Sequence, residues 1–286
     1  MDQVYDFRFP RNKSYAPRKT TMKSPIRWAG SKRQTLPKLR DLWGAGYTRY
    51  VEPFAGSASL FFDIEPQSAV LGDLNWELIT ALRSIRRDVE LVLQCLRRIP
   101  LGEHNYYKVR GQDPTRLSPS ELAARFLYLN HFCFNGLYRT NLKGQFNVPY
   151  GPPKNDSAIR EDAIIAAAKA LQTTELLHAD FEETLNQAQH GDFVFLDPPY
   201  VMNGRRVFRE YLPGSFKGTD LLRLKRVLRA LDSKGAAFVI TYADSVESRK
   251  LLGKWNRTRM WVRRNIAGFA SDRRGYYEML ATNIDI

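Results

Sequence analysis

Short apolar runs alternate with amphipathic stretches along most of the chain. The apolar runs predict strands near residues 50–53, 69–72, 176–179, 193–196 and 236–242. The amphipathic stretches predict helices that begin near residue 60 and cover 76–98, 118–128 and 220–233. Alternating strands and helices are typical of an α/β domain with a mostly parallel sheet, which binds ligands at the carboxyl ends of its strands.

The alternation is interrupted between the second and third predicted strands. Within residues 76–160 the pattern is mainly helical, and Ser118 with Glu121 predicts a capping box at a helix start. Residues 130–151 are rich in Asn, Gly and aromatic side chains and predict a loop or hairpin. We therefore expect 76–160 to be an inserted subdomain that could read a substrate.

The remaining segments complete the expected organisation. Residues 22–75 and 161–286 are predicted to form the domain that the insertion interrupts, with a basic ribbon over 260–277 near its end. Residues 1–21 mix Arg, Lys, Pro and Tyr without periodicity, which predicts a basic, poorly ordered arm.

The net charge of the chain indicates what kind of partner it binds. The 286 residues carry 44 Lys and Arg against 30 Asp and Glu, a formal charge of +14 with a pI near 9.8. Such an excess favours a polyanionic partner. Aromatic residues make up 12% of the chain, and several lie beside arginines in the insertion, which favours nucleic acid over a membrane surface.

Other classes of protein are disfavoured by composition. Two cysteines make no disulfide framework, and with four histidines we expect no metal site. The sequence has no apolar segment of membrane-spanning length and no apolar secretory signal at its start. We expect a cytoplasmic protein with no membrane partner.

The strongest candidate for chemistry is Asp197-Pro198-Pro199-Tyr200, which directly follows the predicted strand at 193–196. The exocyclic amine of adenine is a poor nucleophile, because its lone pair is delocalised into the ring. Asp197 and the Pro198 carbonyl, on a backbone stiffened by two prolines, can each accept one N–H of such an amine. Tyr200 offers a face on which a base can stack. An Asp-Pro turn that only ends a strand is the alternative.

A second candidate site begins at the first predicted strand. The small-residue turn around Gly56 lets a ligand approach the backbone, and Asp73, at the end of the next strand, is suited to bind ribose hydroxyls. The turn lacks the glycine spacing of a dinucleotide fingerprint, and the chain has no Gly-Lys-Ser/Thr phosphate loop. A nucleoside cofactor without phosphates is therefore favoured over a dinucleotide or ATP.

In this order the motifs resemble those of the D12 class N6 adenine-specific DNA methyltransferases, and most closely the Dam family. The resemblance runs from about Met22 to nearly the end of the chain. It rests on segments 26–32, 51–59, 72–75, 134–151 and 197–200. It implies a Rossmann-like methyltransferase domain, S-adenosylmethionine as cofactor, double-stranded DNA as substrate and a target adenine flipped out of the duplex.

The resemblance also implies residue roles. Asp197, Pro198, Pro199 and Tyr200 would be catalytic. The cofactor would be bound by Trp28, Ala29, Gly30, Lys32, Phe54, Ala55, Gly56, Ser57, Asp73, Asn75, Asp180 and Asp197. Ser31 and Ser57-Ala58 replace glycines of the family pattern, which puts cofactor affinity in doubt. Asp180 is equally well explained as the N-cap of a helix.

DNA would be contacted by the segment 134–151. The residues implied are Phe134, Asn135, Leu137, Arg139, Asn141 and Pro149. Arg139 has the geometry to read guanine O6 and N7, and the match favours a GATC-like site. A phosphate clamp is the alternative for Arg139.

Two other functions remain open from sequence. One is a sequence-specific DNA-binding protein that has lost catalysis, and the other is a methyltransferase acting on RNA or on a protein amide nitrogen. The first residue of Asp197-Pro198-Pro199-Tyr200 is Asp, whereas methyltransferases of the latter kind usually have Asn there. Bacterial or phage origin fits the resemblance, and a restriction endonuclease partner is left open.

Overall fold

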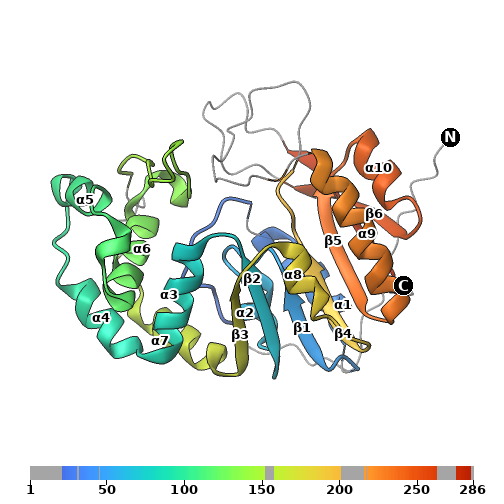
Figure 1. Cartoon of the computed structure of the whole chain (residues 1–286), viewed down its shortest axis with the longest axis horizontal. Coiled ribbons are helices and arrows are strands. Elements are labelled where there is room, and N and C mark those ends of the chain that lie inside the picture. Colours follow the sequence, from blue (N-terminus) through green and yellow to red (C-terminus); the bar gives the residue numbers. More distant parts are fainter. Residues whose placement is uncertain are drawn as a thin grey trace.

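The computed structural model describes residues 21–30, 32–44, 46–151, 158–200, 216, 218–262 and 275–284. They form a seven-stranded sheet with the order β3-β2-β1-β4-β5-β7-β6 (Figure 1). Five strands are parallel: β1 (Arg49–Glu52), β2 (Ala69–Asp73), β3 (Thr174–His178), β4 (Asp192–Leu196) and β5 (Ala237–Ala243). The α/β prediction and these five strands are confirmed.

Two antiparallel strands complete the sheet at one edge. They are β6 (Asn256–Val262) and β7 (Tyr276–Thr282), and β7 pairs with both β5 and β6. The predicted basic ribbon over 260–277 is thus built into the sheet, although its turn at 263–274 lies outside the described residues. The predicted arm also lies outside them, apart from Thr21.

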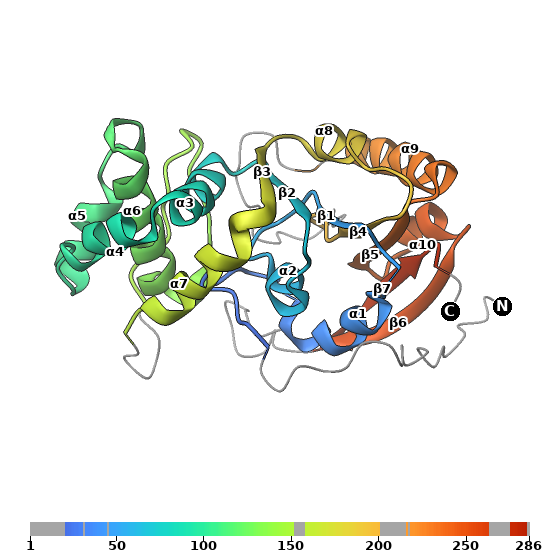
Figure 2. The ribbon, with the colours of Figure 1, turned by 90° about the horizontal axis from the view of Figure 1, so that it is seen from below.

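Alternate residues of the central strands pack into two separate cores. Tyr50 and Phe193 lie in one core with helices α1 (Leu36–Leu42) and α2 (Ser59–Ile64). Val51 and Val194 lie in the other, with α8 (Phe181–Asn186), α9 (Gly218–Lys234) and α10 (Val246–Leu252). Because side chains alternate across a strand, the sheet is buried on both faces. Figure 2 shows α1 and α2 on one side of the sheet and α8 and α9 on the other.

The insertion is a helical lobe beside β2 and β3 (Figure 1). It contains α3 (Trp76–Arg87), α4 (Val89–Arg97), α5 (Glu103–Arg110) and α6 (Pro119–Phe132), with α7 (Glu161–Ala170) packed on α3 and α4. Short 3-10 helices are η1 (Lys32–Gln34), η2 (Pro114–Arg116), η3 (Phe134–Gly136) and η4 (Leu171–Thr173). Leu71 of the sheet and Phe126 of the lobe share one hydrophobic core, so the two parts are packed together.

Two predictions for the lobe are refined by the structure. The helical stretch predicted over 76–98 is confirmed, but it consists of two helices, because Asp88 has φ −156° and its side chain accepts from the Leu91 N–H at 3.0 Å, starting a new helix. The capping box of Ser118 and Glu121 is confirmed.

The predicted hairpin is reduced to two isolated antiparallel bridges, Cys133 with Tyr150 and Thr140 with Phe146. No described helix is both long enough and apolar enough to cross a bilayer.

Candidate active site

The two candidate sites meet at the carboxyl ends of the parallel strands. Strands β1, β2 and β4 are parallel neighbours, so the residues that follow them lie at the same edge. Connections from β1 and β4 run in opposite directions along the sheet, to β2 and to β5, which makes this the switch point where open α/β sheets bind ligands. Asp73 ends β2 and Asp197 follows β4, as the sequence predicted.

Asp197 is held by two neighbours. Thr241 on β5 donates its hydroxyl to Asp197 Oδ1 at 2.8 Å, and Lys32 Nζ lies 3.1 Å from the same oxygen. Burial raises the pKa of Asp197, while the charge of Lys32 acts in the opposite direction. No described residue donates to Oδ2, so this oxygen can accept from a substrate. Pro198 is buried and Pro199 is exposed.

Lys32 connects Asp197 to a group of polar side chains. Its Nζ lies 2.9 Å from the Tyr200 hydroxyl and 3.0 Å from Glu278 Oε1. Burial disfavours the charged amine, but Asp197 and Glu278 outweigh this effect and raise the pKa of Lys32. We predicted Lys32 as a cofactor residue, and the structure brings its ammonium to Asp197, the carboxylate predicted to be catalytic.

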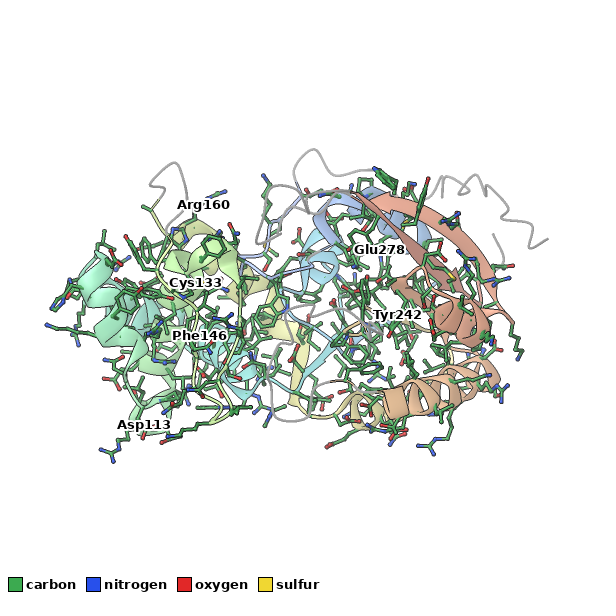
Figure 3. All side chains as sticks on the ribbon, turned by 90° about the horizontal axis from the view of Figure 1, so that it is seen from above. Asp113, Cys133, Phe146, Arg160, Tyr242 and Glu278 are labelled. Atoms are coloured by element: carbon green, nitrogen blue, oxygen red, sulfur yellow. The ribbon has the colours of Figure 1, made fainter. Side chains whose placement is uncertain are left out.

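Tyr200 has its ring and its hydroxyl in defined positions. The hydroxyl donates to Glu278 at 2.8 Å, and the ring centroid is 5.1 Å from that of Tyr242. Glu278 and Tyr242 are labelled in Figure 3, where both lie among the strands of the sheet. The ring of Tyr200, which is predicted to stack on a base, therefore packs against Tyr242, and its hydroxyl is held by Glu278.

The predicted cofactor turn is organised by Asp73. Its Oδ2 accepts from the Gly56 N–H at 2.9 Å, and its Oδ1 accepts from the Asn75 N–H at 2.8 Å. Burial raises the pKa of Asp73, and the two N–H donors oppose that rise. Gly56 has φ +47°, and a Cβ there would lie 2.9 Å from the Trp28 ring. Glycine is needed at this position for both reasons.

The other predicted cofactor residues lie in this turn, at the start of α3 and in the segment before η1. Phe54 stacks on Phe181 at 5.4 Å, the Ala55 N–H donates to the Gly72 carbonyl, and Ser57 Oγ lies 2.8 Å from Ser59 Oγ. Asn75 is buried and caps α3 by accepting from the Leu78 N–H at 3.1 Å. Ala29 is half-buried and Gly30 is exposed with φ +77°.

Asp180 has partners within the protein. It caps α8 through the Glu182 N–H at 3.0 Å and pairs with Arg223 at 2.5 Å. The N-cap interpretation is confirmed. A cofactor contact for Asp180 stays a prediction.

Trp28 joins the cofactor turn to the lobe. Its ring stacks on Tyr138 with centroids 5.5 Å apart and an interplanar angle of 16°. The Tyr138 hydroxyl donates to Glu77 at 3.1 Å, and Arg125 pairs with the other oxygen of Glu77 at 2.7 Å. The preceding residue, Arg27, has both its backbone N–H and its C=O bonded to the side chain of Asn130.

The predicted DNA-reading residues lie on one loop of the lobe. Phe134 and Asn135 are exposed, and Asn135 has φ +55°. Pro149 is exposed too, and its carbonyl accepts from the Phe134 N–H at 2.9 Å. The loop thus presents side chains from both of its arms side by side.

Three further residues of this loop have internal contacts. Arg139 is half-buried and donates from Nε to Asn147 Oδ1 at 2.8 Å, which orients its guanidinium. Asn141 is largely a turn residue, because its Oδ1 accepts from the N–H groups of Lys143 and Gln145. Leu137 is half-buried.

Comparison with known proteins identifies the family. The family model described as D12 class N6 adenine-specific DNA methyltransferase matches residues 28–266. The chain belongs to this family. This methyltransferase is 33% identical over 274 residues to "Type II methyltransferase M1.LlaDCHI" of Lactococcus lactis subsp. cremoris, covering 93% of this chain and 96% of that protein.

Two relatives from Escherichia coli align over a similar length. The "Retron Ec67 DNA adenine methylase" is 32% identical over 267 residues, covering 92% of each chain. The "DNA adenine methylase" of strain K12 is 28% identical over 261 residues, covering 90% of this chain and 93% of the relative. The alignments thus extend over both the sheet and the lobe of this methyltransferase.

Sequence reasoning missed three polar residues of the methyltransferase site. They are Glu52, Thr241 and Glu278, all buried. Glu278 and Thr241 each stand among apolar and aromatic residues of a strand, and a lone polar residue in such a run is the signal that could have found them. Glu52 ends β1, where the same reasoning that selected Asp73 applies.

Proposed function

We propose that this methyltransferase moves a methyl group from S-adenosylmethionine to N6 of an adenine that is flipped out of double-stranded DNA. The observation that carries the proposal is the contact of Asp197 with Lys32 at 3.1 Å, beside the ring of Tyr200 and at the switch point of the sheet. DNA adenine methylases among the bacterial relatives support the substrate and a cytoplasmic site of action.

The residues at the Gly56 turn fit a nucleoside cofactor. Asp73 is partly exposed, and each of its oxygens uses one lone-pair site for a backbone N–H, which leaves a site for a ribose hydroxyl. Gly56 has no side chain, so the Trp28 ring packs directly against its backbone, where a Cβ would lie 2.9 Å from the ring. When bound, S-adenosylmethionine would supply a methyl group on a sulfonium sulfur, so that a nitrogen lone pair can form the new C–N bond as the C–S bond breaks and the neutral thioether leaves.

The catalytic residues act by orientation. Ionised Asp197 accepts one N–H of the adenine amine, and the Pro198 carbonyl accepts the other, so the nitrogen becomes pyramidal and its lone pair is no longer delocalised into the ring. Once the C–N bond has formed, the methylated nitrogen gives up one of these protons to solvent. Lys32 supplies a positive charge 3.1 Å from Asp197, which opposes the rise in the pKa of Asp197 that burial causes and so favours its ionised form. Tyr200 stacks on the base. No covalent bond to the enzyme forms, and positioning in a water-poor pocket supplies most of the acceleration.

DNA reading is assigned to the lobe and its loop. In this proposal residues 76–160 recognise the site, while 22–75 and 161–286 carry cofactor and catalysis. Phe134 and Asn135 enter the space left by the flipped base, and Arg139, held by Asn147, reads a guanine of a short GATC-like sequence. Leu137 and Pro149 contact neighbouring bases.

Replacing Asp197 by Ala tests the proposal. We expect methyl transfer to DNA to fall by at least about 100- to 1,000-fold, as for the loss of one preorganised polar group, while DNA affinity stays within a few-fold of wild type. Transfer of a radiolabelled methyl group and a DNA-binding titration measure the two quantities. Retained turnover would remove Asp197 from the mechanism.

A further inference from the structure

Glu278 is a buried carboxylate that contacts two of the site residues directly. Its Oε1 accepts from Lys32 Nζ at 3.0 Å and from the Tyr200 hydroxyl at 2.8 Å. The Tyr276 hydroxyl donates to the same oxygen at 2.8 Å. Glu278 is 1% exposed, and its Oε2 has no hydrogen-bond partner among the described residues.

A carboxylate in this position is costly for stability. Burying a charge requires compensation, and replacing a buried ion pair by apolar residues is often neutral or stabilising. Strand β7 could fill this position with an apolar residue, as it does at Met279, Leu280 and Ala281. A role in the reaction accounts for Glu278 better than a role in folding.

We propose that Glu278 is a positioning residue for methyl transfer. It holds the ammonium of Lys32 against Asp197, and it fixes the ring of Tyr200 on which the adenine stacks. This inference rests on the proposed function and names the group that keeps its catalytic residues in place.

The geometry of Lys32 carries the first half of this inference. An ammonium has three N–H donors on a flexible four-carbon stem. In this structure three acceptors surround it, at 2.9 Å (Tyr200), 3.0 Å (Glu278) and 3.1 Å (Asp197). Each of the three N–H donors of Lys32 therefore has an acceptor, and these three contacts together fix the position of the ammonium. Without Glu278, Lys32 loses one of the two carboxylates that hold its charge.

The geometry of Tyr200 carries the second half. The ring packs on Tyr242, and the hydroxyl both accepts from Lys32 and donates to Glu278. A ring fixed at its face and at its tip cannot rotate away when a base arrives. One carboxylate thus orients both the group that compensates the charge of Asp197 and the surface that receives the adenine.

Glu278→Gln tests the inference, because it keeps the shape but removes the charge and one acceptor. Asp192→Asn is the matched control. Asp192 is a buried carboxylate that pairs with Arg49 at 2.8 Å at the amino end of β4, on the opposite edge of the sheet from the site. Two quantities are measured in both variants: kcat and KM for DNA methylation, and the titration midpoint of Lys32 from its Cε resonance by NMR.

For Glu278→Gln we expect kcat to fall about 10- to 100-fold, as for the loss of hydrogen bonds to a charged group, with KM for DNA within about threefold of wild type. The Lys32 midpoint should fall, because one of the two carboxylates that raise the pKa of Lys32 is removed. Asp197, Glu278 and Tyr200 are the described titratable groups in contact with Lys32, and Asp192→Asn changes none of them. A kcat for Glu278→Gln equal to that of Asp192→Asn would overturn the inference.

Tyr200→Phe provides a second test that does not depend on the folding of Glu278→Gln. It keeps the ring and removes the hydroxyl, and we expect kcat to fall by about 3- to 10-fold. An unchanged kcat would overturn the proposed fixing of the ring. If wild-type protein methylates no adenine, the proposed function fails. In that case the titration midpoint of Lys32 in Glu278→Gln still tests whether Glu278 stabilises the charge of Lys32. A midpoint equal to that of wild type would overturn this claim.

Discussion

Trp28 and Tyr138 stack nearly face to face, with ring centroids 5.5 Å apart and an interplanar angle of 16°. Trp28 belongs to the segment before η1 that we assign to the cofactor, and its ring also covers Gly56. Tyr138 belongs to the loop that we assign to DNA. This ring contact therefore links the two binding regions, beside the hydrogen bonds of Arg27 with Asn130, and a change in one region is expected to reach the other.

The stack can be separated from the hydrogen bond below it by two substitutions of Tyr138. Tyr138→Phe keeps the ring but leaves Glu77 without one donor, so the free energy of unfolding should fall by about 1 to 3 kcal/mol while cofactor affinity is unchanged. Tyr138→Leu removes the ring as well and should weaken cofactor binding by about 2- to 10-fold. Urea unfolding and calorimetry measure these effects, and equal cofactor affinity in both variants would contradict the role of the stack.

Gly56→Ala should disturb the cofactor turn directly. The left-handed backbone costs about 1 to 2 kcal/mol for a residue with a Cβ, and the new methyl group would displace Trp28. We expect cofactor affinity to fall by about tenfold. Gly102→Ala is the control, because Gly102 has φ +103° but no atom near its Cβ position. Cofactor affinity in Gly56→Ala equal to that in Gly102→Ala would contradict the role of this turn in cofactor binding.

Glu52 should make stability depend on pH. Burial raises its pKa well above the ordinary value, whereas in the unfolded chain it titrates near ~4.3. Its favourable contribution to folding is therefore complete below ~4.3 and is lost as the pH rises through the folded pKa. Glu52→Gln mimics the protonated group, so its free energy of unfolding should match wild type at pH 4 and exceed it at pH 8. Urea unfolding at both values tests this, and a less stable variant at pH 8 would refute it.

Arg139→Ala should relax specificity at one base pair of the recognised site. A bidentate arginine contributes about 1 to 3 kcal/mol of discrimination, so methylation of sites altered at that position should approach methylation of the intact site. Lys143→Ala, on the exposed turn of the same loop, should weaken DNA binding equally for all sequences and lower its salt dependence. Methylation rates of both variants, measured on duplexes that each differ from the recognised site at one base pair, distinguish base reading from phosphate contact. If Arg139→Ala lowered the methylation rate by the same factor on every duplex, Arg139 would contact a phosphate and would not read a base.

The parallel part of the fold and its carboxylates were predictable from sequence. Asp73 and Asp197 follow apolar runs, and parallel strands bring the residues that follow them to one edge. The break at Asp88 was not predicted, because the apolar pattern continues from α3 into α4 and only the capping side chain ends the first helix.

Glu278 could not be assigned to the site from local pattern. It lies 246 positions from Lys32 in the chain, and it reaches the site only because β7 inserts antiparallel between β5 and β6. Neither the register of an antiparallel strand nor its place in the sheet follows from periodicity. The stack of Trp28 on Tyr138 likewise depends on how the lobe packs against the sheet, which tertiary contacts decide.

The central claim is tested most directly by expressing the protein in cells that lack adenine methylation and mapping N6-methyladenine across their genome by single-molecule sequencing, with Asp197→Ala as the control. We predict methylation at one short motif in cells with the wild-type protein and none in cells with the variant. Methylation at unrelated adenines would contradict sequence reading by the loop. No methylation with the cofactor bound would contradict DNA as the substrate, and methylation that persists in Asp197→Ala would contradict the assigned catalytic site.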